Sequence, residues 1–267
     1  MCLTSYTHIL RHPYNDLEER NMPKHLGIIM DGNGRWAEMR GLPRSEGHKR
    51  GVERVHEIVE AVKEVGVEVL SLYAFSIENW MRPEEEVAVI MELLESTLKK
   101  EFESFMKDGV RFRIVGNREK LPETIRAVVE VVEQETGNNS NLILQCALSY
   151  GGRDEIIRAV KKAVAMGAGP DDITENYIAG LLDTAGLPDP DLIIRTSGEQ
   201  RLSNFLLWQS AYSEFYFTNT LWPDFTRGEL LDAIHEYRTR SRRFGKVENS
   251  GNLFAERFPG MPGTRDV

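Results

Sequence analysis

Cysteine is nearly absent from this chain, and its two thiols are not placed for a structural role. Cys2 lies at the extreme amino terminus and Cys146 lies in an apolar run. Two cysteines in these places form neither a disulfide framework nor the closely spaced pair of a metal–thiolate site. Because such a protein has no need of an oxidising compartment, we expect it in the cytoplasm.

Long hydrophobic runs are also missing. No stretch reaches the roughly 18 apolar residues that a membrane-spanning helix requires. The amino-terminal residues include early histidine, arginine and acidic groups where a secretion signal needs an apolar core. We therefore expect neither an integral membrane protein nor an exported one.

Positive charge is in short supply, since Lys and Arg number 33 against 42 Asp and Glu, for a formal net charge of -9. Nucleic-acid binding depends on many basic contacts with phosphates, so we expect no nucleic-acid partner. The exception is residues 238–246, where five basic residues occur without an acidic one. They fit either a helix end, where cations are favourable, or a site that binds a phosphate group.

The chain does have the length and composition of one globular α/β domain, with 267 residues, 41% of them hydrophobic and 28% charged. Short apolar or β-branched runs predict strands at residues 25–30, 67–75, 110–115, 141–148, 191–195 and 214–218. Helical periodicity predicts helices at residues 46–65, 83–107, 122–136, 153–165, 174–183 and 226–243. Strands this far apart cannot form hairpins, so we expect a mainly parallel central sheet of about six strands flanked by helices.

The ends of the chain differ from this pattern, because the tail is rich in Gly, Pro and Asn. We expect a catalytic domain at 23–247 between an amino-terminal extension, 1–22, and a carboxy-terminal tail, 248–267.

The helix predicted at 83–107 carries one apolar stripe. Ordinary core packing explains such a stripe, and the wall of a lipid tunnel is the alternative.

Polar clusters at strand ends are the candidate sites, since ligands of open parallel sheets bind outside the carboxyl ends of the strands. The first cluster follows the strand at 25–30 and contains Asp31, two glycines and Arg35. Gly32 and Gly34 let the backbone approach a phosphate, while Asp31 is a candidate ligand for a bridging Mg²⁺. A tight turn in which Asp31 caps a helix is the structural alternative.

Two further clusters follow the second and fifth predicted strands. The second contains Glu78, Asn79, Trp80 and Arg82 between an apolar strand and an apolar helix, and a cap at the helix start is its structural alternative. The third is the segment 195–204, with two arginines, a glycine turn and Ser203, which suits a diphosphate because guanidinium pairs with phosphate oxygens in a bidentate manner.

Two anion sites with spare carboxylates indicate transfer of a group between two phosphorylated substrates. At these residues the chain resembles the cis-prenyltransferases, the family of undecaprenyl and dehydrodolichyl diphosphate synthases. The resemblance covers about residues 23–246. It rests on HLGIIMDGNGRWA, GHKRG, LYAFSIENWMRP, SYGGRDEI, DLIIRTSGEQRLSNFLLWQSAYSEFYF and LWPDF, in the order that the family has them.

The resemblance implies an enzyme that adds isopentenyl diphosphate repeatedly to an allylic diphosphate and gives a long (Z)-polyprenyl diphosphate, the precursor of a glycosyl carrier lipid. It also implies Mg²⁺, a homodimer, a hydrophobic tunnel and peripheral membrane contact through the product. Asp31 and Glu214 are the implied metal ligands, and Asp31 and Asn79 the implied catalytic residues. Because a neutral carboxamide is a poor base, we expect Asn79 to position a water or a diphosphate oxygen that takes the proton.

The same resemblance assigns substrate binding to three groups and to an Arg-x-Gly element near the end of the chain. These residues are Gly32, Asn33, Gly34, Arg35, Trp36, Arg44 and His48, then Ser76, Ile77, Glu78, Trp80 and Arg82, then Arg195, Arg201, Leu202 and Ser203, and finally Arg243 and Gly245. Two departures from bacterial relatives are Ser197, where a glycine is common, and Gln200, where a histidine is common.

Three other functions have weaker support in the sequence. A haloacid-dehalogenase-like phosphatase would need a second carboxylate where Asn33 stands. A trans-prenyltransferase would need two DDxxD motifs, which the chain lacks; Asp171 and Asp172 only approach one and are better placed as helix-start residues. A non-catalytic prenyl-binding subunit would be expected to have lost Asp31.

Overall fold

The computed structural model describes residues 22–240 and is built on one six-stranded sheet. The strands are β1 (His25–Ile29), β2 (Val69–Ser76), β3 (Val110–Val115), β4 (Leu142–Tyr150), β5 (Leu192–Arg195) and β6 (Glu214–Phe217). They lie in the order β3-β4-β2-β1-β5-β6, and every neighbouring pair is parallel. The predicted parallel sheet is confirmed, because the long connections leave no room for hairpins.

The helices are α1 (Asn33–Glu38), α2 (Arg44–Glu64), α3 (Glu84–Asp108), α4 (Glu123–Glu135), α5 (Gly152–Ala165), α6 (Glu175–Ala179) and α7 (Arg227–Thr239). Short 3₁₀ helices occur at Ile77–Met81, Arg118–Lys120, Pro170–Asp172, Gln209–Tyr212 and Trp222–Asp224. The sequence did not predict α1, which is too short to show a periodic apolar pattern. The helix predicted at 174–183 is shorter than expected, and Gly180 is its C-cap.

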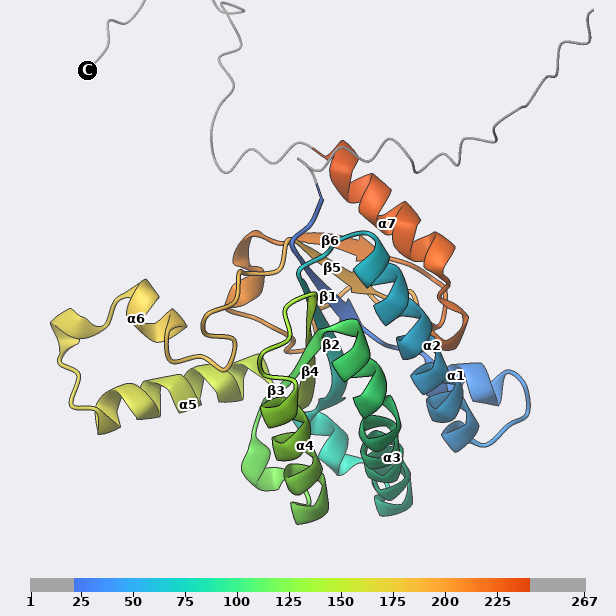
Figure 1. Ribbon diagram of the computed structural model, residues 1–267, viewed down its shortest axis with the longest axis horizontal. Coiled ribbons are helices and arrows are strands. Elements are labelled where there is room, and N and C mark those ends of the chain that lie inside the picture. The colour runs from blue at the N-terminus through green and yellow to red at the C-terminus, as the bar shows by residue number, and fades with distance from the viewer. Residues whose placement is uncertain (1–21, 241–267) are drawn as a thin grey trace, which may run out of the picture.

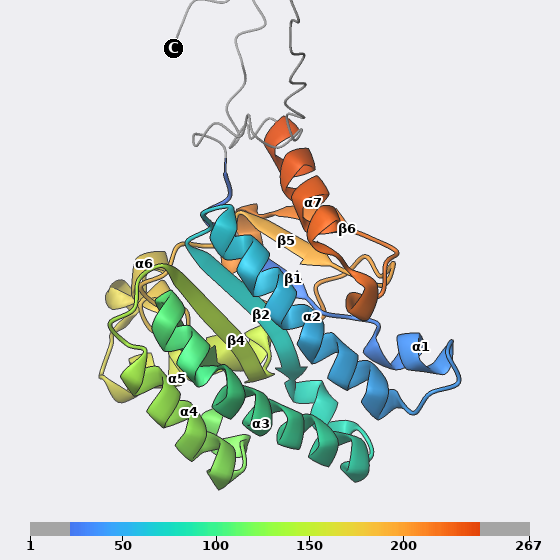
Figure 2. The ribbon, with the colours of Figure 1, turned by 45° about the vertical axis from the view of Figure 1, so that its right-hand side comes forward.

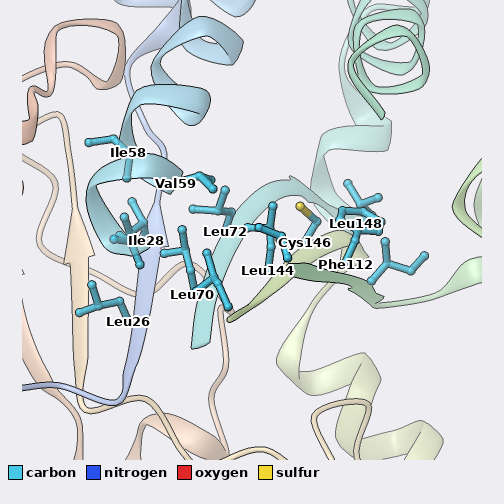
Figure 3. Close-up of a cluster of buried hydrophobic side chains, with 14 of the residues drawn as sticks. Leu26, Ile28, Ile58, Val59, Leu70, Leu72, Phe112, Leu144, Cys146 and Leu148 are labelled. Carbon is cyan, nitrogen blue, oxygen red and sulfur yellow. The ribbon is translucent and has the colours of Figure 1, made fainter. Parts of the chain in front are cut away.

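Helices cover both faces of the sheet, and Figures 1 and 2 show α2, α3, α4 and α7 on one of them. Their buried side chains pack with those of the strands into the largest core cluster. Figure 3 shows part of it, with Ile58 and Val59 of α2 above Leu26 and Ile28 of β1. On the opposite face, Phe205 and Leu206 pack against Tyr73 and Tyr150, and α5 and α6 share a smaller cluster. None of the helices within residues 22–240 has the length and hydropathy needed to cross a membrane.

The long helix α3 is bounded by residues that stop the helical pattern at each end. It begins after Pro83 with three successive glutamates, which are favourable at the positive end of the helix dipole. It ends at Gly109, whose φ of 68° is readily adopted by glycine. Figure 2 shows α3 between α2 and α4, and it contacts both helices.

The sheet order creates the crevice that the sequence predicted. From β1 the chain passes to β2 on one side, whereas β5 pairs with β1 on the other side. The connections that leave the carboxyl ends of β1 and β5 therefore run in opposite directions. Open α/β sheets bind ligands in the crevice at such a point. Asp31 follows β1 and Arg195 ends β5, so the two candidate residues meet at this point.

Candidate functional site

A cavity of about 610 Å³ lies at the carboxyl edge of the sheet. Its walls come from the segments that follow β1, β2 and β5 and from the start of α2. Among the predicted site residues it brings together Asp31, Gly32, Asn33, Gly34, Arg35, Arg44, His48, Ser76, Glu78, Asn79, Arg82, Arg195 and Ser203. Segments up to 172 residues apart, from Asp31 to Ser203, thus share one polar chamber.

Asp31 is fixed by contacts from β5 and from the segment after it. Its Oδ2 accepts a hydrogen bond from Arg195 Nη2 at 2.9 Å, and Arg35 Nη2 lies 3.4 Å from its Oδ1. Burial alone would raise the pKa of Asp31, but hydrogen bonds from Arg195 and Ser197 and the charges of both arginines outweigh it and lower the pKa. The carboxylate is therefore ionised at neutral pH and faces the cavity.

Gly32, which follows Asp31, requires a glycine for two reasons. Its φ is 111°, and a Cβ would lie only 2.9 to 3.1 Å from atoms of Leu221. The same segment of the chain holds Asp31 in place, because the Trp222 backbone N–H donates to the Asp31 carbonyl oxygen at 3.0 Å. The LWPDF motif thus supports the turn that carries the carboxylate.

Arg195 is 3% exposed and connects the Asp31 turn to the following loop. One guanidinium nitrogen donates to Asp31, and Nη1 donates to Ser203 Oγ at 2.8 Å and to the Arg201 carbonyl oxygen. Its buried Nε has no partner among the described residues. A buried arginine that lines a polar cavity is suited to an anionic ligand.

Ser197 is a site residue that the sequence analysis noted only as a departure from relatives. Its φ is 80°, in the region where glycine is most at ease, which explains why a glycine suits this position. The serine hydroxyl accepts a hydrogen bond from Arg35 Nη2 and also hydrogen-bonds Asp31. A glycine would keep the turn but lose this link between the two charged groups.

Glu86 was missed by the sequence analysis, although it contacts three predicted site residues. Arg44 Nε lies 3.3 Å, His48 Nε2 3.1 Å and Arg82 Nη1 2.8 Å from its carboxylate oxygens. Burial lowers the pKa of His48 despite the neighbouring carboxylate. The spacing of Arg82 and Glu86, four residues apart across the start of α3, was the available clue.

Asn79 and Ser76 form a reciprocal cap at the start of the 3₁₀ helix after β2. Ser76 N donates to Asn79 Oδ1 at 3.1 Å, and Asn79 N donates to Ser76 Oγ at 3.3 Å. Trp80 packs edge-on against Phe75 and donates from Nε1 to Ser149 Oγ at 2.9 Å. The side-chain oxygen of Asn79 accepts the hydrogen bond of this cap. The side-chain N–H groups of Asn79 are therefore the ones that could donate to a ligand.

Several predicted residues lie apart from the cavity. Glu214 is the first residue of β6 and pairs with Arg240 at 3.0 Å, so it lies at the amino edge of the sheet, opposite to Asp31. Trp36 lies under Arg40 and donates to Asp224. The exposed Arg201 pairs with Glu199, and Leu202 packs against the core cluster of Phe205. Ile77 lies next to Gly151, and Trp80 packs against Phe75. Arg243 and Gly245 lie outside the described residues.

A second, apolar cavity of about 160 Å³ adjoins the polar one and runs between α2 and α3. Both cavities are lined by Met30, Asn33, His48, Ala74 and Ile90. From there the apolar cavity passes Leu94, Thr97 and Leu98 of α3 and extends as far as Asp108. A polar chamber and an apolar cavity therefore share one wall.

The polar cavity fits a divalent cation only if a ligand supplies most of the donors. Within residues 22–240 no cluster of three His, Cys, Asp or Glu side chains is arranged to hold a metal. Asp31 is a single ionised carboxylate beside cationic groups. Mg²⁺ is commonly bound through one or two carboxylates together with substrate phosphates and water, so Asp31 and a diphosphate would make a suitable site.

Comparison with known proteins gives consistent relatives over most of the chain. The family model described as putative undecaprenyl diphosphate synthase matches residues 29–245. An isoprenyl transferase of Agrobacterium fabrum is 53% identical over 231 residues, covering 85% of this chain and 94% of that protein. An isoprenyl transferase of Aquifex aeolicus is 49% identical over 226 residues, covering 85% and 97%.

Two solved structures share the fold. Lavandulyl diphosphate synthase from Lavandula x intermedia, in complex with dimethylallyl diphosphate, has a TM-score of 0.81 at 37% identity and covers 84% of this chain and 99% of that one. A probable undecaprenyl diphosphate synthase from Campylobacter jejuni has a TM-score of 0.73 at 39% identity, covering 85% and 100%.

The parallel sheet and its cationic, carboxylate-bearing chamber define an α/β enzyme that transfers prenyl groups. The chain belongs to the undecaprenyl diphosphate synthase family of isoprenyl transferases. Cis-prenyl chain elongation is the activity of this family, and divalent-metal dependence is general in it.

Proposed function

We propose that this enzyme condenses isopentenyl diphosphate repeatedly with farnesyl or geranylgeranyl diphosphate and releases a long-chain (Z)-polyprenyl diphosphate, the precursor of a glycosyl carrier lipid. The observation that carries this proposal is the shared wall of the two cavities. A diphosphate held in the polar chamber would have its hydrocarbon chain directed into the apolar one. Each added unit would then lengthen the chain away from the charged groups.

In this proposal the two diphosphates occupy neighbouring parts of the polar chamber. The allylic diphosphate binds at the Asp31 turn, where Arg35, Arg44 and His48 supply donors. Isopentenyl diphosphate binds at Arg195 and Ser203, with Arg201 and the Arg243 and Gly245 element as further contacts. Guanidinium groups suit both, since they pair with phosphate oxygens in a bidentate manner.

The chain's own residues would favour group transfer by stabilising charge. When bound at Asp31, a divalent cation, Mg²⁺ in this proposal, neutralises negative charge on the departing diphosphate. Arg35 and Arg195 add preorganised positive charge beside the same oxygens. The isopentenyl double bond attacks the allylic carbon, and the Asn79 amide orients the oxygen that takes the proton lost afterwards.

The direct test is incubation of the purified protein with labelled isopentenyl diphosphate, an allylic diphosphate and Mg²⁺, followed by chromatography of the extracted lipid. Incorporation into long lipid products that depends on both substrates is the expected result. If each primer is tested separately, the preferred one follows from the relative rates. No labelled lipid with either primer would overturn the proposal.

The apolar cavity is proposed as the tunnel that receives the growing chain, and a bulky side chain in it should shorten the product. Thr97 lines the cavity halfway along α3, so Thr97→Trp is expected to give shorter products while the first condensation keeps its rate to within about twofold. The neighbouring Ser96 is exposed, and Ser96→Trp is the matched control. Chromatography of labelled products checks both. Unchanged lengths in Thr97→Trp would exclude this route for the chain.

A homodimer is proposed from an apolar stripe on α5. Ala159 and Ala163 of this helix are buried, whereas Ile157, Val160 and Val164 on its other side are 55%, 46% and 71% exposed. A row of large apolar side chains on one helix face is the kind of surface that a second copy covers.

Burying a carboxylate in such a contact is costly, so Val160→Asp is expected to weaken the dimer by about tenfold or more. Sedimentation velocity over a range of protein concentrations measures the change. Val131→Asp on α4 is the matched control, because Val131 is also exposed, at 57%, but lies on another helix. Equal association of the two variants would show that α5 is not the interface.

Three further proposals concern the chain as a whole. The catalytic domain spans residues 23–247 between the extension 1–22 and the tail 248–267, the enzyme acts in the cytoplasm, and its lipid product brings it into peripheral contact with a membrane. The family match at residues 29–245 supports the domain limits.

A further inference from the structure

Asn204, directly after the predicted isopentenyl diphosphate residue Ser203, hydrogen-bonds two distant segments, the start of α5 and the loop after β2. Its φ is 67°, in the left-handed region that asparagine adopts more readily than most residues. The loop is tied to the sheet at the same point, because Tyr73 Oη donates to the Ser203 carbonyl oxygen at 3.1 Å and to that of Tyr150 at 3.2 Å.

Asn204 caps the start of α5 from a distant part of the chain. The N-cap residue of α5 is Gly151, which has no side chain to offer the first amide groups. The backbone carbonyl oxygen of Asn204 accepts a hydrogen bond from Gly152 N at 2.7 Å, and its side-chain Oδ1 accepts one from Arg153 N at 2.9 Å. A Cβ at Gly151 would lie 2.6 Å from Asn204 Nδ2, so glycine leaves room for this arrangement.

The other half of the Asn204 amide faces the loop after β2. Nδ2 donates to Glu78 Oε1 at 3.0 Å, which joins residues 126 positions apart at the wall of the polar cavity. The orientation of the amide is unambiguous, because a backbone N–H can only donate and a carboxylate only accept. Asparagine is thus required as acceptor and donor at once, and aspartate would supply only the acceptor.

We propose that Asn204 is a positioning residue that locks the Glu78 loop to the isopentenyl diphosphate loop and so sets the spacing between the two diphosphate sites. The lock also gives the Glu78 carboxylate, which lines the polar cavity, a hydrogen-bond donor in Asn204 Nδ2. This inference rests on the proposed function for its kinetic readout, although the Glu78 to Asn204 contact itself does not.

The experiment compares Asn204→Asp, Glu78→Gln and the double variant. Asn204→Asp keeps the cap on Arg153 but sets two carboxylates face to face, so the KM for isopentenyl diphosphate should rise about tenfold, the effect of losing one hydrogen bond to a charged group. This deficit should shrink as the pH falls, because one of two adjacent carboxylates then binds a proton.

The double variant reverses the polarity of the pair, because the amide introduced by Glu78→Gln can donate to the carboxylate introduced by Asn204→Asp. We expect its KM to return to within about twofold of Glu78→Gln alone. If Glu78→Gln lacks turnover, titration calorimetry with isopentenyl diphosphate makes the same comparison through Kd. Asn117→Asp is the matched control, since Asn117 caps Glu119 N on a separate 3₁₀ helix.

A KM or Kd unchanged in Asn204→Asp, or no recovery in the double variant, would overturn the proposal. Urea denaturation of the four proteins separates this failure from failure of the proposed function. Should the wild type elongate no prenyl chain, a favourable coupling free energy between positions 78 and 204 would still support the lock. A coupling free energy of zero between the two positions would contradict the lock.

Discussion

Replacing Asp31 with alanine is expected to lower turnover about a hundredfold or more, because it removes the ionised carboxylate around which the polar chamber is arranged. Asp31 accepts from Arg195 and lies beside Arg35, so its loss also frees two guanidinium groups that it orients. The candidate site for a divalent cation disappears with it. Steady-state incorporation of labelled isopentenyl diphosphate, with both substrates saturating, measures the change.

Asp31→Asn separates the charge from the shape of the side chain. The amide cannot accept from both arginines as a carboxylate does, so its turnover should be nearly as low as that of the alanine variant. Asp171→Ala is the control, because Asp171 is an exposed aspartate outside the chamber. Wild-type turnover in Asp31→Ala, with normal thermal unfolding, would refute the assignment of Asp31.

The sheet was predictable because each strand is a short apolar run separated from the next by a helix-length segment. All six strands lie within two residues of their predicted bounds. The two short helices were harder to predict from the sequence, since α1 and α6 make too few turns to display an apolar face. Their limits depend on contacts with distant residues, such as Trp36 with Asp224, that local periodicity does not contain.

The position of Glu214 shows how strand direction bears on a candidate site. Asp31 follows β1, whereas Glu214 begins β6. In a parallel sheet the start and the end of a strand lie at opposite edges, so these two carboxylates are separated by the length of β6 within one chain. The role of Glu214 as a metal ligand came from the family resemblance and not from its place in the strand, and it stays a prediction.

The residues missed next to the chamber are those whose role depends on a long-range neighbour. Ser197 matters because Arg35 lies against its hydroxyl, and Glu86 because Arg44 and His48 meet it from α2. In the sequence, Ser197 is a small polar residue in a turn, and Glu86 is a glutamate at an acidic helix start. Surface residues of both types are common at such positions, so the sequence alone does not mark either residue as part of a site.

Stability should fall by about 3 kcal/mol as the pH drops from 7.5 towards 4, owing to His25 in β1. The ring is 1% exposed, with Nδ1 2.7 Å from the Pro188 carbonyl oxygen and Nε2 2.7 Å from Ser71 Oγ. Gln145 Nε2 donates to the same hydroxyl at 2.8 Å, which leaves the hydroxyl hydrogen of Ser71 available to the ring. This arrangement suits a neutral imidazole.

Burial lowers the pKa of His25 from 6.5 to about 4, although the Pro188 carbonyl and the Asp191 charge oppose this. Between these values the unfolded chain binds a proton that the folded one does not. The stabilising contribution is therefore complete above pH 6.5 and is lost as the pH falls towards 4.

Urea unfolding at a series of pH values tests the assignment to His25. The variant His25→Asn should be less stable than the wild type at pH 7.5, because it disturbs the buried hydrogen bonds, but should lose about 3 kcal/mol less on acidification. His235→Asn, at an exposed position of α7, is the matched control. A wild-type profile no steeper than that of His25→Asn would show that other groups govern the acid lability, such as His48 or Glu86, whose pKa values are also lowered in the fold.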